Sequence, residues 1–297
     1  MTIRQAIAEY ANAHALVAGV CTAEPLPPID GLTDIPFSNA EERDRRDPAR
    51  LLPGARSVVV LGAGYARHCA APFGGEPRGR ITAMAVGEDY HITMRRHIDG
   101  LREALAPFGS FESYLHVDTG PLCERAFALR AGIGFRGRNR YVISPRFGTF
   151  FNLGLLITTL DIPADTPSTQ TCAECGRCIA ACPGGALRVD GFDYTRCISY
   201  ISQKKGVLMD WEADLLGEAI YGCDICGAVC PHNRVTESHQ EDIDALWPRV
   251  DSITGLTNAA FRERYGQTAM GWRGPAVMKR NAENAARVYK ARRKGRD

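Results

Sequence analysis

The sequence predicts a mixed helix-and-strand protein of the α+β class, with a cysteine-rich module in its second half. Short apolar runs rich in β-branched residues alternate with helix-like patterns through about the first 160 residues. Eight cysteines then gather between Cys172 and Cys230. Helical periodicity dominates the chain after about residue 243. These observations separate a mixed part, a cysteine module and a helical end.

Periodicity predicts the elements of the mixed part. Residues 3–11 carry apolar side chains at helical spacing, and Ser57–Gly62 is an apolar run bounded by glycine, which predicts a central strand. Loops are expected over residues 22–54, with a short helix near 39–44, and over 66–80. Further strands are expected at 16–20, 113–117, 141–144 and 154–160, helices at 89–106 and 121–131, and a glycine-rich loop at 132–139.

A linker rich in Pro, Asp and Thr, residues 161–171, suggests a domain boundary at about residue 165. The predicted parts are a mixed domain, a cysteine module and a basic helical segment, at residues 1–165, 166–240 and 241–297. Helices are expected within the last two parts at 210–221, 258–265 and 278–292.

Composition excludes several classes of protein. The chain has 297 residues, 45% of them hydrophobic, and a net charge of +2, so there is no global signal for nucleic-acid or membrane binding. The first residues lack the apolar core of a signal peptide, and no run of about 18 apolar residues predicts a membrane span. Eleven cysteines without an export signal indicate a reducing compartment, so we expect a cytoplasmic protein. Buried structural thiols are expected at Cys21, Cys69 and Cys123.

The cysteine spacing is the strongest chemical signal. Residues 172–183 read C-x2-C-x2-C-x3-C-P, which is the bacterial ferredoxin pattern for cubane iron–sulfur clusters. Residues 223–231 read C-x2-C-x3-C-P, one cysteine short of a full set, and Cys197 can supply the missing thiolate. A zinc ribbon or disulfides are the alternatives, but zinc sites usually use two C-x2-C pairs and this pattern is asymmetric.

Two [4Fe–4S] clusters need eight thiolates, and this region holds eight. In ferredoxin patterns the cysteine before proline binds the other cluster of the pair. Cluster one is therefore predicted to use Cys172, Cys175, Cys178 and Cys230. Cluster two is predicted to use Cys182, Cys197, Cys223 and Cys226.

Segments along most of the chain resemble the epoxyqueuosine reductase family, in family order and with the same eight-cysteine spacing. The resembling segments are residues 46–61, 87–91, 118–126, 131–139, 196–201, 221–226 and 280–281. The resemblance implies an N-terminal α/β cobalamin-binding domain, followed by a ferredoxin-like two-cluster domain and a short helical C-terminus. It also implies reduction of epoxyqueuosine to queuosine at the tRNA wobble position.

The resemblance implies the chemistry as well. Electrons from an external low-potential donor of the flavodoxin or ferredoxin type would pass through the two clusters to cobalamin. Low-valent cobalt would attack an epoxide carbon, an acid would protonate the leaving oxygen, and loss of water would give the alkene. A monomer without membrane association is expected.

Asp118 is at the family's proposed proton-donor position. The local sequence favours the same role, because Asp118 follows the end of an apolar strand, where α/β folds place catalytic groups. The alternative is a structural role as an Asx-turn or helix N-cap, since Thr, Gly and Pro follow it.

Other site residues are predicted with plain loop, cap or solvent-exposed roles as alternatives. His91 and His116 are candidates for axial cobalt ligands, but neither sits in a matching motif and no axial histidine is assigned. Cobalamin contacts are predicted from Asp118, Arg138, Asn139, Ser144, Asn152, Ser199 and Gly222. Substrate contacts are predicted from Asp89, Tyr90, His91, Lys279 and Arg280, the last two opening a basic tail suited to tRNA phosphates.

Two other functions remain open from the sequence. Residues 80–86 and His232 depart from the family pattern where substrate and cofactor contacts are expected. A dehalogenase-like corrinoid iron–sulfur reductase of a small molecule is therefore one alternative. A non-catalytic ferredoxin-type electron carrier is the other.

Overall fold

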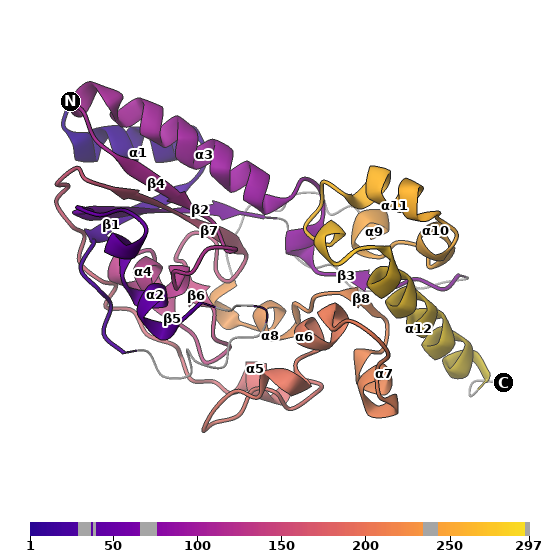
Figure 1. Ribbon diagram of the computed structural model, residues 1–297. Coiled ribbons are helices and arrows are strands. Elements are labelled where there is room, and N and C mark those ends of the chain that lie inside the picture. The colour runs from indigo at the N-terminus through magenta and orange to yellow at the C-terminus, as the bar shows by residue number, and fades with distance from the viewer. Residues whose placement is uncertain (29–36, 38–39, 66–75, 234–242, 295–297) are drawn as a thin grey trace. The chain divides into compact units, whose positions relative to one another are not determined.

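The computed structural model describes residues 1–28, 37, 40–65, 76–233 and 243–294, and the chain forms two compact units (Figure 1). Unit 1 comprises residues 1–64, 91–174 and 232–236. Unit 2 comprises residues 65–90, 175–231 and 237–297. The mixture of helices and strands confirms the predicted α+β class. The boundaries predicted at about 165 and 240 stay predictions.

Unit 1 is built on a four-stranded antiparallel sheet in the order β1-β2-β7-β4. The two central strands are almost entirely buried, with Val58–Leu61 and Leu155–Ile157 all at 0% exposure. Burial on both faces explains why these strands read as continuous apolar runs. The strands are β1 (Val17–Thr22), β2 (Ser57–Gly64), β7 (Phe151–Thr158) and β4 (Ser113–His116).

Helices cover both faces of this sheet, with α1 (Ile3–Ala13) and α3 (Tyr90–Leu105) on one side and α4 (Glu124–Arg130) on the other (Figure 1). The α3 helix buries Met94, Ile98, Leu101 and Leu105, the face that its periodicity predicts. It approaches β7 closely at Gly154, where a Cβ atom would come within 2.8 Å of Ile98 Cδ1.

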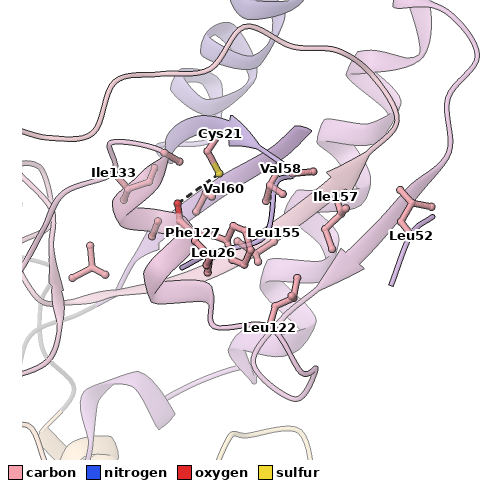
Figure 2. Close-up of a cluster of buried hydrophobic side chains, with 14 residues drawn as sticks. Cys21, Leu26, Leu52, Val58, Val60, Leu122, Phe127, Ile133, Leu155 and Ile157 are labelled. Carbon is pink, nitrogen blue, oxygen red and sulfur yellow. Dashed lines mark hydrogen bonds between the residues drawn. The ribbon is translucent and has the colours of Figure 1, made fainter. Parts of the chain in front are cut away.

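The core beneath α4 centres on Phe127, which is fully buried among residues of β1, β2 and β7 (Figure 2). Cys21 belongs to this core, and burial raises the pKa of its thiol to about 12. Its predicted role as a buried structural thiol is confirmed. Cys123 is half-buried, and Cys69 lies outside the described residues.

Unit 2 combines a short parallel strand pair, β3 (Arg80–Ile81) and β8 (Ala219–Tyr221), with small helices and the long helix α12 (Pro275–Lys294). Its main core joins β8 to the C-terminal helices through side chains such as Ile220, Phe261 and Met278. The other helices are α5 (Arg177–Ala180), α6 (Ile198–Gln203), α7 (Asp210–Leu216), α8 (Ile225–Ala228), α9 (Ile243–Leu246), α10 (Asp251–Thr254) and α11 (Asn258–Tyr265).

A fully buried polar side chain, Asn281, connects α12 to the rest of unit 2. Its Nδ2 donates to the carbonyl oxygens of Ser202 and Ile220, at 2.7 Å each. Its Oδ1 accepts hydrogen bonds from the guanidinium of Arg280. Because a buried amide without partners is costly, these bonds fix α12 against α6 and β8.

The structure corrects several predicted elements. The helix expected over 210–221 ends at Leu216, because Gly217 turns the chain with a φ of +60°, and residues 219–221 form β8 instead. The expected glycine-rich loop contains β5 (Phe135–Arg136), which pairs with β6 (Val142–Ile143). The helix expected from residue 121 begins only at Glu124, because the preceding backbone is held by His116.

Smaller differences concern the loops. The short helix expected near residues 39–44 is α2 (Glu42–Arg46). Residues 66–75 of the expected loop lie outside the described residues, and its last residue, Arg80, begins β3. Among the described helices, none has both the length and the apolar composition needed to cross a bilayer.

Replacing Phe127 with alanine should lower the free energy of unfolding by about 3–5 kcal/mol, because it empties the centre of the core beneath α4. Urea unfolding followed by circular dichroism would measure this loss. The control Phe127→Leu keeps most of the volume and should cost about 1 kcal/mol. A loss of no more than about 1 kcal/mol in Phe127→Ala would show that the volume of this side chain contributes little to stability.

Candidate functional site

Asp118 lies two residues beyond the end of β4, in a tight turn. Its φ of +46° is in the left-handed region, which is uncommon for a residue other than glycine. The N–H of Thr119 donates to the carbonyl oxygen of Val117 at 2.6 Å and closes a three-residue turn around Asp118. Such strained conformations persist only where neighbouring groups enforce them, and they are concentrated at functional sites.

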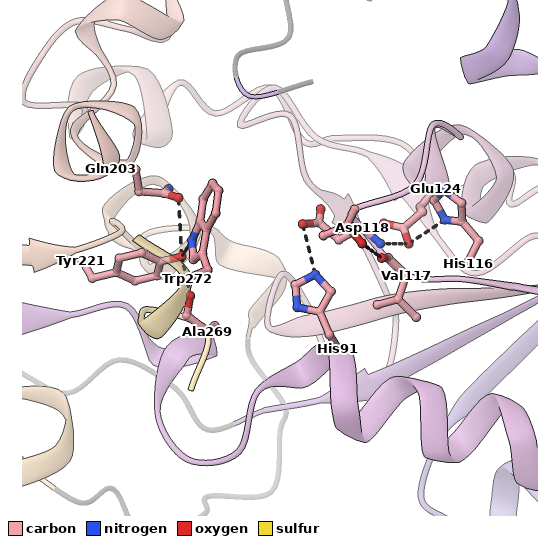
Figure 3. A network of polar contacts seen from close by, with 10 residues as sticks. His91, His116, Val117, Asp118, Glu124, Gln203, Tyr221, Ala269 and Trp272 are labelled. Atoms are coloured by element: carbon pink, nitrogen blue, oxygen red, sulfur yellow. Dashed lines mark hydrogen bonds and ion pairs between the residues drawn. The ribbon is translucent and has the colours of Figure 1, made fainter. Parts of the chain in front are cut away.

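The groups that enforce this turn are Glu124, the first residue of α4, and His116, the last residue of β4 (Figure 3). Glu124 Oε1 accepts a hydrogen bond from the N–H of Asp118 at 2.7 Å and lies 3.3 Å from His116 Nδ1. His116 Nε2 accepts a hydrogen bond from the N–H of Leu122 at 3.0 Å. Nε2 is therefore unprotonated, and the neutral imidazole carries its proton on Nδ1 and donates it to Glu124.

This arrangement excludes one of the roles left open for His116 and one of those left open for Asp118. The His116 side chain is fully buried and both of its ring nitrogens have protein partners, so it has no nitrogen to offer a cobalt ion. The first residue before α4 is Cys123, so Asp118 is not a helix N-cap.

The carboxylate of Asp118 faces His91, a residue of the first turn of α3 (Figure 3). Asp118 Oδ2 lies 3.5 Å from His91 Nε2, and the Asp118 side chain is 59% exposed. An exposed carboxyl group beside an imidazole can release a proton to a ligand while the imidazole stabilises the remaining charge.

Five of the predicted cluster cysteines gather in unit 2. Burial raises the pKa of the Cys226 thiol, and four other thiolates are close enough to raise that pKa further: Cys178, Cys182, Cys197 and Cys223. Burial also raises the pKa of Cys197, and that of Cys223 to about 11. Burial and mutual repulsion keep these closely spaced sulfurs as neutral thiols, so a bound metal centre is needed to deprotonate them together.

Cys172 belongs to unit 1, and Cys175 and Cys230 to unit 2. The ten cysteines that the structure describes are all free thiols. Over the same residues, no three His, Cys, Asp or Glu side chains converge on a single metal ion.

The predicted cobalamin contacts fall into two groups. In unit 1, Arg138 pairs with Glu174 at 3.1 Å. Asn139 is buried, and its side chain accepts a hydrogen bond from the N–H of Tyr141. Ser144 is also buried, and its hydroxyl accepts one from the N–H of Arg146. Asn152 is half-buried on β7. In unit 2, Ser202 connects Ser199 with Gly222, because its hydroxyl donates to Ser199 O and accepts from Gly222 N–H.

The predicted substrate contacts are more dispersed. Asp89 and Tyr90 belong to unit 2, where the N–H of Asp89 donates to Gln267 O and Tyr90 packs on the C-terminal core. Lys279 donates to Leu256 O, and Arg280 donates to Lys204 O and Gly206 O. Both cations therefore have partners within the fold.

Ion pairs also occupy part of the predicted basic tail. Arg287 pairs with Asp214 at 2.8 Å, and Arg292 pairs with Glu218 at 2.7 Å. Lys290, Arg293 and Lys294 at the end of α12 are also exposed.

Sequence reasoning missed the supporting groups. Glu124 and His116 were visible as polar residues flanking the Asp118 turn, but nothing in their spacing gave their hydrogen bonds. Asp224 is 4% exposed. The sequence signal for it is a charged residue among the apolar residues around Tyr221 and Ile225.

Comparisons with known proteins identify the family. A family model described as "4Fe-4S double cluster binding domain" matches residues 171–233, and one described as "Epoxyqueuosine reductase QueG, DUF1730" matches residues 45–119. The epoxyqueuosine reductase of Staphylococcus aureus is 35% identical over 300 residues, which cover 94% of this chain and 78% of the relative. This chain belongs to the epoxyqueuosine reductase family. The Bacillus subtilis epoxyqueuosine reductase is 34% identical over 264 residues, which cover 86% and 68% of the two chains.

Solved epoxyqueuosine reductases share the fold. The Streptococcus thermophilus structure aligns with a TM-score of 0.86 and 32% identity, covering 96% of this chain and 81% of that one. A structure with an epoxyqueuosine-modified tRNA stem loop aligns with a TM-score of 0.87 and 30% identity, covering 97% and 82%. The predicted family, fold and two-cluster module are confirmed. Membership makes the chain an iron–sulfur oxidoreductase and favours epoxyqueuosine reduction over the small-molecule and electron-carrier alternatives.

Replacing Glu124 with alanine should destabilise unit 1 by about 1–3 kcal/mol, because it leaves the buried His116 Nδ1–H without an acceptor. Glu124→Gln keeps an acceptor oxygen at the same place and should cost less. Urea unfolding of both variants tests the network. Equal stability of Glu124→Ala and Glu124→Gln would contradict a hydrogen bond from His116 to Glu124.

Proposed function

We propose that this chain reduces the epoxide of epoxyqueuosine in tRNA to the alkene of queuosine, with Asp118 as the proton donor. The observation that carries the proposal is the exposed Asp118 carboxyl group, held by a strained turn and facing His91 at 3.5 Å. Removing the epoxide oxygen consumes two electrons and two protons and releases one water molecule.

Asp118 would act in its protonated form. Its carboxyl group donates a proton to the epoxide oxygen as the carbon–oxygen bond breaks, and general acids of this kind accelerate reactions by about 10²–10⁴-fold. His91 then stabilises the carboxylate and can return a proton to it. A solved relative from Bacillus subtilis has a catalytic aspartate loop swung out of its active site, which supports assigning catalysis to an aspartate on a turn.

The two clusters would deliver the electrons. We assign cluster one to Cys172, Cys175, Cys178 and Cys230, and cluster two to Cys182, Cys197, Cys223 and Cys226. Cys226 lies within electrostatic range of the other three members of the second set, and also of Cys178, which is assigned to cluster one. The electrons would come from an external low-potential donor of the flavodoxin or ferredoxin type.

Cobalamin is the proposed cofactor that meets the epoxide, and when bound it supplies a strongly nucleophilic low-valent cobalt. The residues of unit 1 fit a large ligand rich in amide groups. Arg138 Nε and His232 Nε2 are buried, and neither has a hydrogen-bond partner among the described residues. The contacts from Arg138, Asn139, Ser144, Asn152, Ser199 and Gly222 stay predictions.

The tRNA would be recognised through its phosphates. A relative was solved with a tRNA stem loop, and the exposed cations Lys290, Arg293 and Lys294 could provide such contacts here. Asp89, Tyr90, Lys279 and Arg280 stay predicted substrate contacts. We further propose that the chain acts as a cytoplasmic monomer.

Replacing Asp118 with asparagine should lower queuosine formation by about 10²–10⁴-fold, because the amide cannot donate the proton. Asparagine also tolerates positive φ, so the turn should survive. Protein reconstituted with iron, sulfide and cobalamin would be assayed anaerobically with epoxyqueuosine tRNA, and nucleosides would be measured by mass spectrometry. The control is Asp190→Asn at an exposed turn. Turnover by Asp118→Asn equal to that of the control would exclude Asp118 as the acid.

Replacing Cys197 with serine should remove cluster two and lower the iron content from about eight to about four atoms per chain. Iron analysis and the visible absorption of the reconstituted protein provide the measurement. Cys123→Ser, outside both ligand sets, should keep all the iron. Full iron content in Cys197→Ser would contradict the assignment of the eighth ligand.

A further inference from the structure

The segment that precedes α3 reaches a predicted ligand of cluster two. The N–H of Arg80 donates to Glu218 O at 2.7 Å, and the N–H of Thr82 donates to Tyr221 O at 2.8 Å. These bonds, together with the parallel β3–β8 pairing, place residues 80–83 alongside the chain that leads to Cys223.

Arg80 contacts the sulfur directly. Its Nη2 lies 3.8 Å from Cys223 Sγ, at hydrogen-bond distance for a sulfur acceptor, and the contact is partly buried.

Cys223 is held in this position from both sides. Asp224 is buried, and its carboxylate accepts hydrogen bonds from the hydroxyl of Thr82 and from the N–H of Ala83, the latter at 2.7 Å. Gly222 has a φ of +71°, and a Cβ atom there would lie 2.4 Å from Thr82 Cγ2. The backbone on both sides of Cys223 is therefore held against the segment that carries Arg80.

We propose that Arg80 raises the reduction potential of cluster two by donating a charged hydrogen bond to the Cys223 thiolate. One-electron reduction adds a negative charge to a cluster and breaks no bond, so a cation at a ligand sulfur stabilises the reduced form. Arg80 adjusts the reduction potential of cluster two and is not a catalytic residue. The inference rests on the proposed ligand set of cluster two. It places the start of the 80–86 segment beside a proposed cluster ligand.

The test is a redox titration of the reconstituted protein with dithionite, followed by electron paramagnetic resonance, without cobalamin or tRNA. Arg80→Gln should shift the potential of one cluster to a more negative value and leave the other unchanged. Arg80→Lys keeps the charge without the planar fork and should shift the same potential less. The matched control is Arg78→Gln, which removes a cation two residues before Arg80. Arg78 pairs with Asp244, so this variant should leave the potentials of both clusters unchanged.

The signal of cluster two is identified by its absence in Cys197→Ser. Assembled clusters with unchanged potentials in Arg80→Gln would overturn the inference. A shift of the other cluster instead, or an equal shift in Arg78→Gln, would overturn it as well.

Arg80→Met provides a second neutral variant if Arg80→Gln does not assemble its clusters. If both neutral variants lose cluster two and Arg80→Lys keeps it, a positive charge is required beside the ligand, which supports the inference. Loss in all three variants contradicts the inference, because a structural role would then be sufficient. Failure of the proposed function is distinguishable, because it would appear as missing iron or missing turnover in the unsubstituted protein.

Discussion

The pairing of β7 with its neighbours is the constraint on which the candidate active site depends. β7 is buried along most of its length, so its backbone groups must find partners in the sheet, and β2 and β4 provide them on its two sides. The register of β4 places His116 opposite Leu155. Because His116 then receives the N–H of Leu122 and reaches Glu124, the position of Asp118 follows from the sheet.

Local patterns were sufficient to predict the parts of the molecule that depend on local physics. The buried face of α3, the apolar run of β2 and the eight-cysteine spacing all follow from periodicity or from covalent distances along the chain. The β3–β8 pair could not be predicted, because each strand is very short and the hydrogen bonds that define it join residues far apart in sequence. Thr82 and Asp224, for example, are separated by 142 residues.

Charge was the least predictable property. The basic residues near the C-terminus suggest a surface for phosphates, yet Arg280 donates to backbone carbonyls, and Arg287 and Arg292 pair with carboxylates. A count of cations cannot separate those used within a fold from those exposed to a partner. The Arg80–Cys223 contact shows the same limit, because a strand with one charged residue does not reveal which atom that charge faces.

The two units are interleaved along the chain, since residues 65–90 belong to unit 2 although unit 1 surrounds them in sequence. A gene fragment beginning at Cys175 would therefore lack β3 and the residues that hold Cys223 and Asp224. On the ribosome, β3 is synthesised long before β8, so this part of the cysteine module has no partner until most of the protein has been made. Assembly of the proposed cluster two is in this way tied to the synthesis of β8, and chains that stop before β8 are not expected to hold it.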